Sequence, residues 1–135
     1  MTFIVDASVT LAWCFEDEAT EATEAVLRRL LTEGGLAPSH WPLEVANALR
    51  SGERRGRLNQ EKLEEARSVL TILPVDVATA DIGSALGLLD TARAHDLSVY
   101  DAAYLDLAAS RSMGLATIDQ RLAAVCRTVG IPLIA

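Results

Sequence analysis

Met-Thr-Phe-Ile-Val-Asp-Ala-Ser, residues 1–8, is the stretch from which the fold can be read. Phe3, Ile4 and Val5 form a short run of aromatic and β-branched side chains, which predicts a strand buried on both faces. The run ends on Asp6, and Ser8 is expected to cap a helix over residues 9–15. Because ligands bind outside the carboxyl ends of the strands in an open parallel sheet, Asp6 is predicted to lie at the floor of a candidate site.

Short strands and helices alternate along the rest of the chain. We expect further strands at residues 36–38, 73–75, 113–117 and 131–134, with the Pro74 strand at an edge. Helices are expected at residues 18–33, 39–51, 60–70 and 81–94, then from Ser98, and finally from Asp119 or a neighbour. This pattern predicts a single α/β domain over residues 1–135. We expect a three-layer α/β/α sandwich with a mostly parallel sheet of about five strands.

Helical spacing also predicts which faces are buried. The helix that starts near residue 39 is expected to turn Leu43, Val45, Ala46 and Leu49 inward. In the helix over 81–94, the predicted apolar stripe consists of Ile82, Ala85, Leu86 and Leu89.

The charge balance limits the partners of the chain. The sequence has 12 Lys and Arg against 19 Asp and Glu, a formal net charge of −7, which argues against tight, unaided binding to nucleic-acid phosphates. The charges are segregated, so a nucleic-acid substrate is not excluded. An acidic cluster contains Glu16, Asp17, Glu18, Glu21 and Glu24, and a basic cluster contains Arg50, Arg54, Arg55, Arg57 and Lys62. For the basic cluster, a solvated helix face and a contact with an RNA backbone are both open.

The sequence favours a cytoplasmic location. No apolar run approaches the ~20 residues of a membrane span, and Asp6 interrupts the first apolar run, so we expect neither a membrane segment nor a secretory signal. Cys14 and Cys126 have no metal-binding or redox spacing and are expected to be reduced thiols in the core.

Four acidic residues are not easily explained as a solvated surface. Asp6 and Asp119 follow predicted strands, and Glu44 and Asp101 lie in the first turns of predicted helices among apolar neighbours. An N-cap or a helix-dipole role remains open for each one alone. Together, however, four carboxylates at one edge of a sheet would repel one another.

A divalent cation would remove this repulsion. Oxygen ligands with no His or Cys nearby favour Mg²⁺ or Mn²⁺ over Zn²⁺. One or two such ions can activate a water and stabilise both oxygens of an in-line phosphodiester displacement. We therefore expect Mg²⁺, with Mn²⁺ as the alternative, to bind at this edge.

Four blocks of sequence, in this order, resemble the PIN domain. They are Val-Asp-Ala-Ser at 5–8, Trp-Pro-Leu-Glu-Val-Ala-Asn-Ala-Leu at 41–49, Leu-Ser-Val-Tyr-Asp-Ala-Ala-Tyr-Leu at 97–105 and Leu-Ala-Thr-Ile-Asp-Gln-Arg-Leu at 115–122. More narrowly, they resemble the toxins of VapBC toxin–antitoxin pairs, and the resemblance covers essentially the whole chain.

The resemblance implies a metal-dependent endoribonuclease that acts as the toxin of a type II toxin–antitoxin system. In that interpretation Asp6, Glu44, Asp101 and Asp119 hold Mg²⁺ or Mn²⁺ for RNA hydrolysis. Asp6 and Asp101 are implied direct ligands, Glu44 binds directly or through water, and the family pattern varies most at Asp119. The implied partners are an RNA substrate, an antitoxin that blocks the site, and a second copy in a homodimer.

The resemblance also suggests supporting residues, and some roles stay open. Ser8, Asn47 and Thr117 match polar positions that could donate to the carboxylates. His40 and His95 lack ligand spacing and are expected to have surface or capping roles. Trp13 and Trp41 are expected to pack in the core.

Two other functions compete with the nuclease. One is phosphoryl transfer through an Asp6 nucleophile, although Lys62 is the only lysine and no Gly-rich phosphate loop is present. The other is a catalytically inactive PIN-like binding module.

Overall fold

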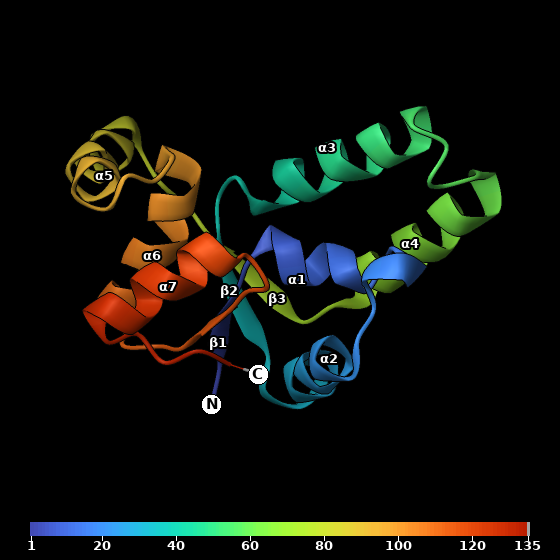
Figure 1. Cartoon of the computed structure of the whole chain (residues 1–135), viewed down its shortest axis with the longest axis horizontal. Helices are drawn as coiled ribbons and strands as arrows, with labels where there is room; N and C mark the ends of the chain where they lie inside the picture. Colours follow the sequence, from blue (N-terminus) through green and yellow to red (C-terminus); the bar gives the residue numbers. More distant parts are fainter. Residues whose placement is uncertain (135) are drawn as a thin grey trace.

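A four-stranded parallel sheet forms the centre of the computed structural model, which describes residues 1–134 (Figure 1). The strands pair in the order β3-β2-β1-β4. They are β1 (Phe3–Val5), β2 (Gly35–Pro38), β3 (Val75–Ala78) and β4 (Leu115–Ala116). The helices are α1 (Ala7–Ala12), the 3-10 turn η1 (Glu16–Glu18), α2 (Glu21–Glu33), α3 (Trp41–Arg54), α4 (Gln60–Ile72), α5 (Ile82–His95), α6 (Val99–Arg111) and α7 (Gln120–Val129).

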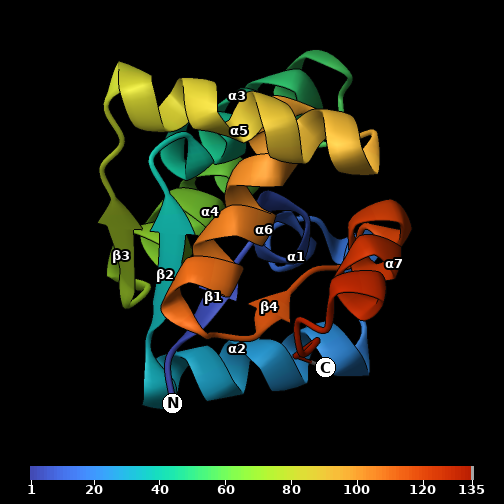
Figure 2. The ribbon, with the colours of Figure 1, turned by 90° about the vertical axis from the view of Figure 1, so that its left-hand side faces the viewer.

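The helices form two outer layers, which confirms the predicted three-layer α/β/α class. Helices α5, α6 and α7 lie on one side of the sheet, and α1 to α4 lie on the other (Figure 1). In Figure 2, α6 passes in front of the sheet while α1 and α4 lie behind it. Helix α3 begins three residues after β2, at the carboxyl edge of the sheet.

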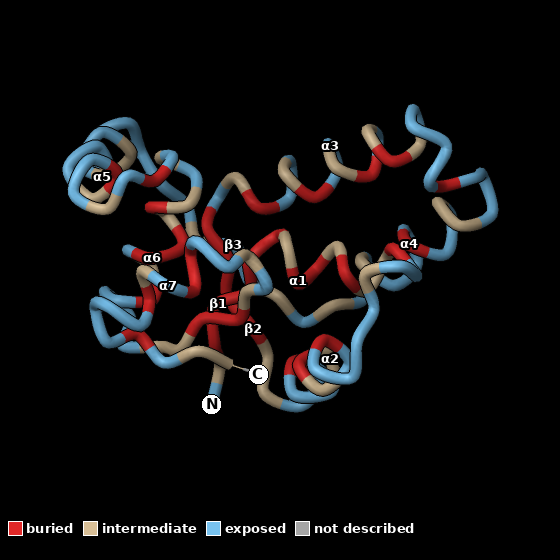
Figure 3. The backbone as a smooth tube through the Cα atoms, in the orientation of Figure 1, coloured by how far each residue is buried: buried red, intermediate tan, exposed pale blue. Residues whose placement is uncertain are grey.

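Strand β1 is the centre of the core, as its sequence predicts. Phe3 and Val5 pack with residues of α2, whereas Ile4 belongs to the cluster that contains Tyr104 and Leu105 of α6. All three β1 residues are buried (Figure 3), because helices cover both faces of the sheet.

Two glycines allow α2 to join the sheet. Gly34 ends α2 with φ +74°, a conformation that side chains other than glycine rarely adopt. A Cβ on Gly35 would lie 2.6 Å from Leu30 Cδ1 and 2.8 Å from Val5 Cγ2. Residue 35 must therefore lack a side chain for β2 to lie this close to β1 and α2.

The expected fifth strand at residues 131–134 is reduced to one bridge. Leu133 pairs with Leu115 in the parallel sense, through hydrogen bonds from Leu115 N to Pro132 O and from Ile134 N to Leu115 O, both 2.9 Å. Pro132 has no N–H to donate, and β4 is only two residues long, so no regular ladder forms. The sheet thus has four strands rather than about five. Strand β3 lies at the edge as predicted, but it begins after Pro74 and runs Val75–Ala78 instead of 73–75.

Two predictions about the helices need correction. The helix expected over 18–33 is interrupted, because Thr20 and Thr23 form a capping box that starts α2 afresh at Glu21. Some predicted inward faces point to solvent: Leu43 is 76% exposed and Ile82 is 75% exposed. In α3, Val45 and Leu49 are buried as predicted, together with Trp41 and Gly52, whereas Ala46 is exposed like Leu43.

The remaining predictions concern the thiols and the membrane. Cys14 and Cys126 are free, and Cys126 is buried, as expected for reduced core thiols. Within residues 1–134, none of the helices combines the length and apolar character needed to cross a bilayer.

Candidate active site

Asp6 lies at the junction between β1 and α1 and is only 4% exposed. Its Oδ1 accepts hydrogen bonds from the Ser8 hydroxyl at 2.7 Å and from Val9 N–H at 3.0 Å, and its Oδ2 accepts one from the Thr117 hydroxyl. The bond from Val9 makes Asp6 the N-cap of α1. The prediction that Ser8 is the cap is wrong, because α1 begins at Ala7 and Ser8 already lies in its first turn.

The hydroxyls of Ser8 and Thr117 join the ends of β1 and β4. Their oxygens lie 3.2 Å apart, and they accept the backbone N–H groups of Ile118 and Asp119 respectively, each at 3.0 Å. The two residues therefore fix the orientation of Asp6, which is the supporting role expected for them.

Burial sets the charge state of Asp6. Desolvation raises the pKa of Asp6 from 3.8 to about 6, against the opposing effect of its three hydrogen bonds. The carboxylate of Glu44 raises this pKa further. Asp6 and Glu44 are thus close enough to repel each other.

Glu44 lies in the first turn of α3 and is held by a tyrosine of α6. The Tyr104 hydroxyl donates to Glu44 Oε1 at 2.8 Å, and His40 Nε2 lies 3.3 Å from the same oxygen. Burial first and the Glu44 charge second raise the pKa of Tyr104 well above its usual value, so the hydroxyl remains a donor. Tyr104 is only 1% exposed, so it belongs to the core and also positions Glu44.

This contact with Tyr104 is a feature that the sequence analysis missed. Tyr104 follows Asp101 by three residues, and Glu44 follows His40 by four, so helical spacing places each pair on one face. The spacing does not reveal that the two helices meet at Glu44. His40 N–ε2 is buried without a hydrogen-bond partner in residues 1–134, and its contact with Glu44 differs from the surface or capping role expected for it.

Asp101 lies in the first turn of α6, where Ser98 provides the cap. The Asp101 N–H donates to Ser98 Oγ at 3.0 Å, and the Asp101 carboxylate takes no part in the cap. Burial, followed by repulsion from Asp119 and Glu44, raises the pKa of Asp101. The Asp101 carboxylate therefore lies near two other predicted site residues.

Asp119 is the N-cap of α7, as the sequence allowed. Its Oδ1 accepts from Arg121 N–H at 2.9 Å and from Leu122 N–H at 3.1 Å. Its charge also raises the pKa of Asp101, so these two carboxylates lie near each other. One oxygen of Asp119 is thus committed to the helix.

The four carboxylates are better suited to a divalent cation that keeps several waters than to an ion enclosed entirely by protein ligands. Within residues 1–134, no three His, Cys, Asp or Glu side chains form a ready-made metal site. Mg²⁺ needs only one or two carboxylates and keeps several waters, so a spread set of oxygen ligands suits it. Arg121 lowers the pKa of Asp101 but is also engaged with Asp96 at 3.0 Å, and burial and the neighbouring carboxylates still raise that pKa overall.

Two hollows adjoin Glu44 on α3. The first, of about 360 Å³, runs along the polar face of α3 past Asn47, Ser51 and Arg55. The second, of about 340 Å³, is lined by His40, Leu43, Glu44, Asn47 and Tyr100. Asn47 makes no side-chain hydrogen bond within residues 1–134, so the expectation that it donates to a carboxylate is not met.

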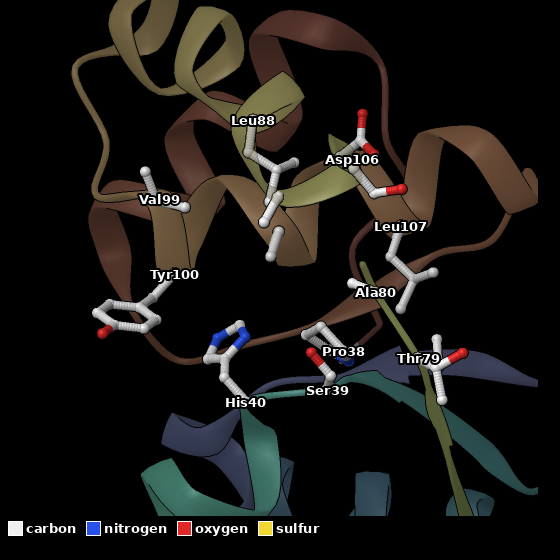
Figure 4. A pocket seen from close by; sticks show the side chains of 14 residues that line it. Pro38, Ser39, His40, Thr79, Ala80, Leu88, Val99, Tyr100, Asp106 and Leu107 are labelled. Atoms are coloured by element: carbon white, nitrogen blue, oxygen red, sulfur yellow. The ribbon is translucent and has the colours of Figure 1, made fainter. Parts of the chain in front are cut away.

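A further hollow lies beside the carboxylates. Figure 4 shows this space of about 280 Å³ between α5, α6 and the ends of β2 and β3, with His40 and Tyr100 near one end and Thr79 and Leu107 near the other. Its lining is mainly apolar and includes none of the four predicted ligands.

Two of the five basic-cluster residues pair with the acidic cluster. Arg57 pairs with Asp17 at 3.0 Å and with Glu18 at 2.8 Å, and Lys62 pairs with Glu16 at 2.7 Å. By contrast, Arg55 makes no ion pair with any described residue and lines the hollow that Glu44 shares.

Comparisons with known proteins agree with the architecture. The PIN domain family profile matches residues 3–128. The chain is 32% identical over 127 residues to ribonuclease VapC3 of Pyrobaculum aerophilum, covering 91% of this chain and 93% of that protein. The crystal structure of PAE2754 from Pyrobaculum aerophilum resembles the fold with a TM-score of 0.65 and 22% identity, covering 99% of this chain and 90% of that one.

Proposed function

The chain belongs to the PIN domain family, and from this premise we propose that it is a Mg²⁺- or Mn²⁺-dependent endoribonuclease, the toxin of a VapBC-type pair. The observation that carries the proposal is the group of four carboxylates at the carboxyl edge of the sheet. Besides burial, Glu44 raises the pKa of Asp6 and, together with Asp119, that of Asp101, and Arg121, which opposes the shift at Asp101, is already paired with Asp96. The relative named a ribonuclease supports RNA as the substrate.

Asp6, Glu44, Asp101 and Asp119 would hold the ion, which supplies an activated water and stabilises the charge that develops on the phosphate. The chain itself supplies the orientation. Ser8 and Thr117 hold the Asp6 carboxylate, and Tyr104 holds that of Glu44. One oxygen of Asp119 accepts the N–H groups of its helix cap, so its other oxygen would be the one available to the ion.

The substrate backbone would follow the polar face of α3. Glu44, Asn47, Ser51 and Arg55 border one hollow along this helix. Arg55 is the cation of that face that remains available to a phosphate.

An acyl-phosphate on Asp6 is disfavoured. Asp6 is 4% exposed and both of its oxygens accept hydrogen bonds, so it is poorly placed to attack a phosphorus atom. Lys62, the only lysine, is paired with Glu16 on a different part of the molecule.

The proposal extends to partners. An antitoxin protein would bind over the carboxylates and block them, and two copies of the chain would form a homodimer. Exposed Ile82, Leu86 and Leu89 on α5 offer apolar surface to a second chain. Light scattering of the purified chain would measure the dimer directly.

The decisive experiment compares Asp101→Asn with Asp106→Asn on the same helix. With Mg²⁺, the parent and Asp106→Asn should cut RNA, while Asp101→Asn should lose roughly 10²-fold or more of the activity. Calorimetry should show weaker Mg²⁺ binding for Asp101→Asn with the fold unchanged. If Asp101→Asn cuts RNA as fast as the parent, the proposed site is wrong.

A further inference from the structure

Tyr100 is exposed although it directly precedes the candidate ligand Asp101. Its side chain is 64% exposed, and Leu43, across the same hollow of about 340 Å³, is 76% exposed. We propose that this hollow, the base notch (His40, Leu43, Glu44, Asn47 and Tyr100), holds one unpaired base of the RNA substrate, stacked on Tyr100. The inference rests on the proposed nuclease function and adds the feature of the substrate that positions the phosphate.

Other aromatic rings pack against the inner side of Tyr100 and hold it as a stacking surface. The rings of Tyr104, His40 and Tyr100 form a row in which neighbouring centroids lie 5.1 Å apart. The row runs outward from the core, because Tyr104 is 1% exposed and Tyr100 is 64% exposed. Figure 4 shows the His40 and Tyr100 rings side by side. An aromatic ring that is fixed on its inner side and open to solvent outside suits base stacking.

Asn47 gives the base notch a polar edge. Its side-chain amide is exposed and has both donors and an acceptor, none of which is used within residues 1–134. Unpaired bases in RNA are recognised by stacking combined with hydrogen bonds to the base edge. The volume also lies in the range of about 300–1,000 Å³ typical of small-ligand sites.

The charge of the molecule favours a base, rather than another phosphate, as the group bound in the base notch. The net charge is −7, and most of the basic cluster is paired with acids. Attraction to phosphates is therefore weak, whereas stacking does not depend on net charge. Glu44 borders both the base notch and the polar hollow along α3, so a base held in the notch would place its phosphate beside the carboxylates.

The test combines a substitution in the protein with the removal of single bases from the RNA. Once the cleavage position is mapped with the parent and Mg²⁺, the flanking bases are removed one at a time as abasic nucleotides. We expect Tyr100→Ala to lower kcat/KM by about 5- to 150-fold, mainly through KM, since stacking acts on the ground and transition states alike. Tyr100→Phe keeps the ring and should restore most of the loss. Ile72→Ala, at a 74% exposed residue that ends α4 just before β3, is the control for loss of an exposed apolar side chain.

The decisive result is non-additivity. One abasic position should weaken the parent but leave Tyr100→Ala unaffected, because the ring that the base contacts is already gone. Equal abasic effects in both proteins would overturn the inference while leaving the nuclease function intact. A loss of dimer mass in Tyr100→Ala, with equal loss on every RNA, would assign the notch to a second copy of the chain instead. A parent that cuts no RNA would overturn the nuclease function and this inference with it.

Discussion

Replacing Tyr104 with phenylalanine removes one hydroxyl from the contact between α6 and α3. That hydroxyl donates to Glu44 Oε1 at 2.8 Å, and hydrogen bonds to charged groups are worth about 1.5–3 kcal/mol. The Glu44 side chain is 40% exposed, so water replaces part of the lost bond. We therefore expect Tyr104→Phe to lower the free energy of unfolding by about 1–2 kcal/mol, or roughly 3–5 °C in Tm per kcal/mol.

The assay is a double-mutant cycle with Glu44→Ala, measured by guanidinium chloride unfolding. The four proteins should share one denaturant slope, so that differences in midpoint report stability alone. In the Glu44→Ala background the tyrosine hydroxyl is buried without its partner, and its removal should cost almost nothing. The expected coupling free energy is about 1 kcal/mol or more.

Two outcomes would contradict this reasoning. Tyr104→Phe could be as stable as the parent, which would show that the hydrogen bond contributes nothing. Alternatively, the same loss could occur with and without Glu44, and the loss would then belong to core packing. An RNA cleavage assay provides a second measurement. Without the tyrosine hydroxyl, Glu44 loses its fixed orientation, so Tyr104→Phe should need about 10- to 100-fold more Mg²⁺ for half-maximal activity.

Three further predictions concern packing, thiols and charge. Gly35→Ala should lower the free energy of unfolding by about 1–3 kcal/mol, because the added methyl group would overpack against Leu30 and Val5. Thermal melts that match the parent would refute the close approach of β2 to β1 and α2. Burial raises the pKa of Cys14 and of Cys126 to about 11. At pH 8 only about one thiol in a thousand is then ionised, labelling by Ellman's reagent should be slow until denaturant is added or the pH approaches 11, and fast native labelling would disprove this. Arg55→Ala should weaken RNA binding and reduce the slope of the logarithm of the binding constant against the logarithm of the salt concentration by about 0.7. Arg57 is already paired with acids, so Arg57→Ala should leave this slope unchanged. Equal effects of the two substitutions would count against the polar face of α3 as the RNA path.

Local signals predicted much of the fold. Asn59 caps α4 and Ser98 caps α6, each by accepting a backbone N–H three residues later. Strand β1 follows from three apolar residues, and the parallel order follows from the alternation of strands and helices. These features depend on neighbours in sequence, which is why they could be predicted from it.

The missed features depend on contacts between distant segments. Helix α5 has apolar residues on more than one side, and packing against α6 buries Ala92 rather than Ile82. Likewise, whether Asp6 or Ser8 caps α1 depends on where the first helical turn begins, and Thr117, the residue after β4, helps to hold Asp6 there.

The candidate site likewise combines features that local sequence predicts with features that depend on distant contacts. Its four carboxylates could be found because strand ends and first helical turns recur at one edge of a parallel sheet. The Tyr104 contact joins residues 60 apart in sequence, and no local pattern reports it.

The double use of Asp6 has a genetic consequence. Asp6 caps α1 and holds two hydroxyls, whereas the carboxylate of Asp101 closes no helix cap. Under the proposed toxin function, cells that survive with Asp6→Ala, which removes the cap of α1, should contain little of the protein, whereas survivors with substitutions at Asp101 should contain abundant, inactive protein. Surviving alleles at Asp101 would then encode a folded decoy that still occupies its antitoxin, and alleles at Asp6 would behave as simple losses.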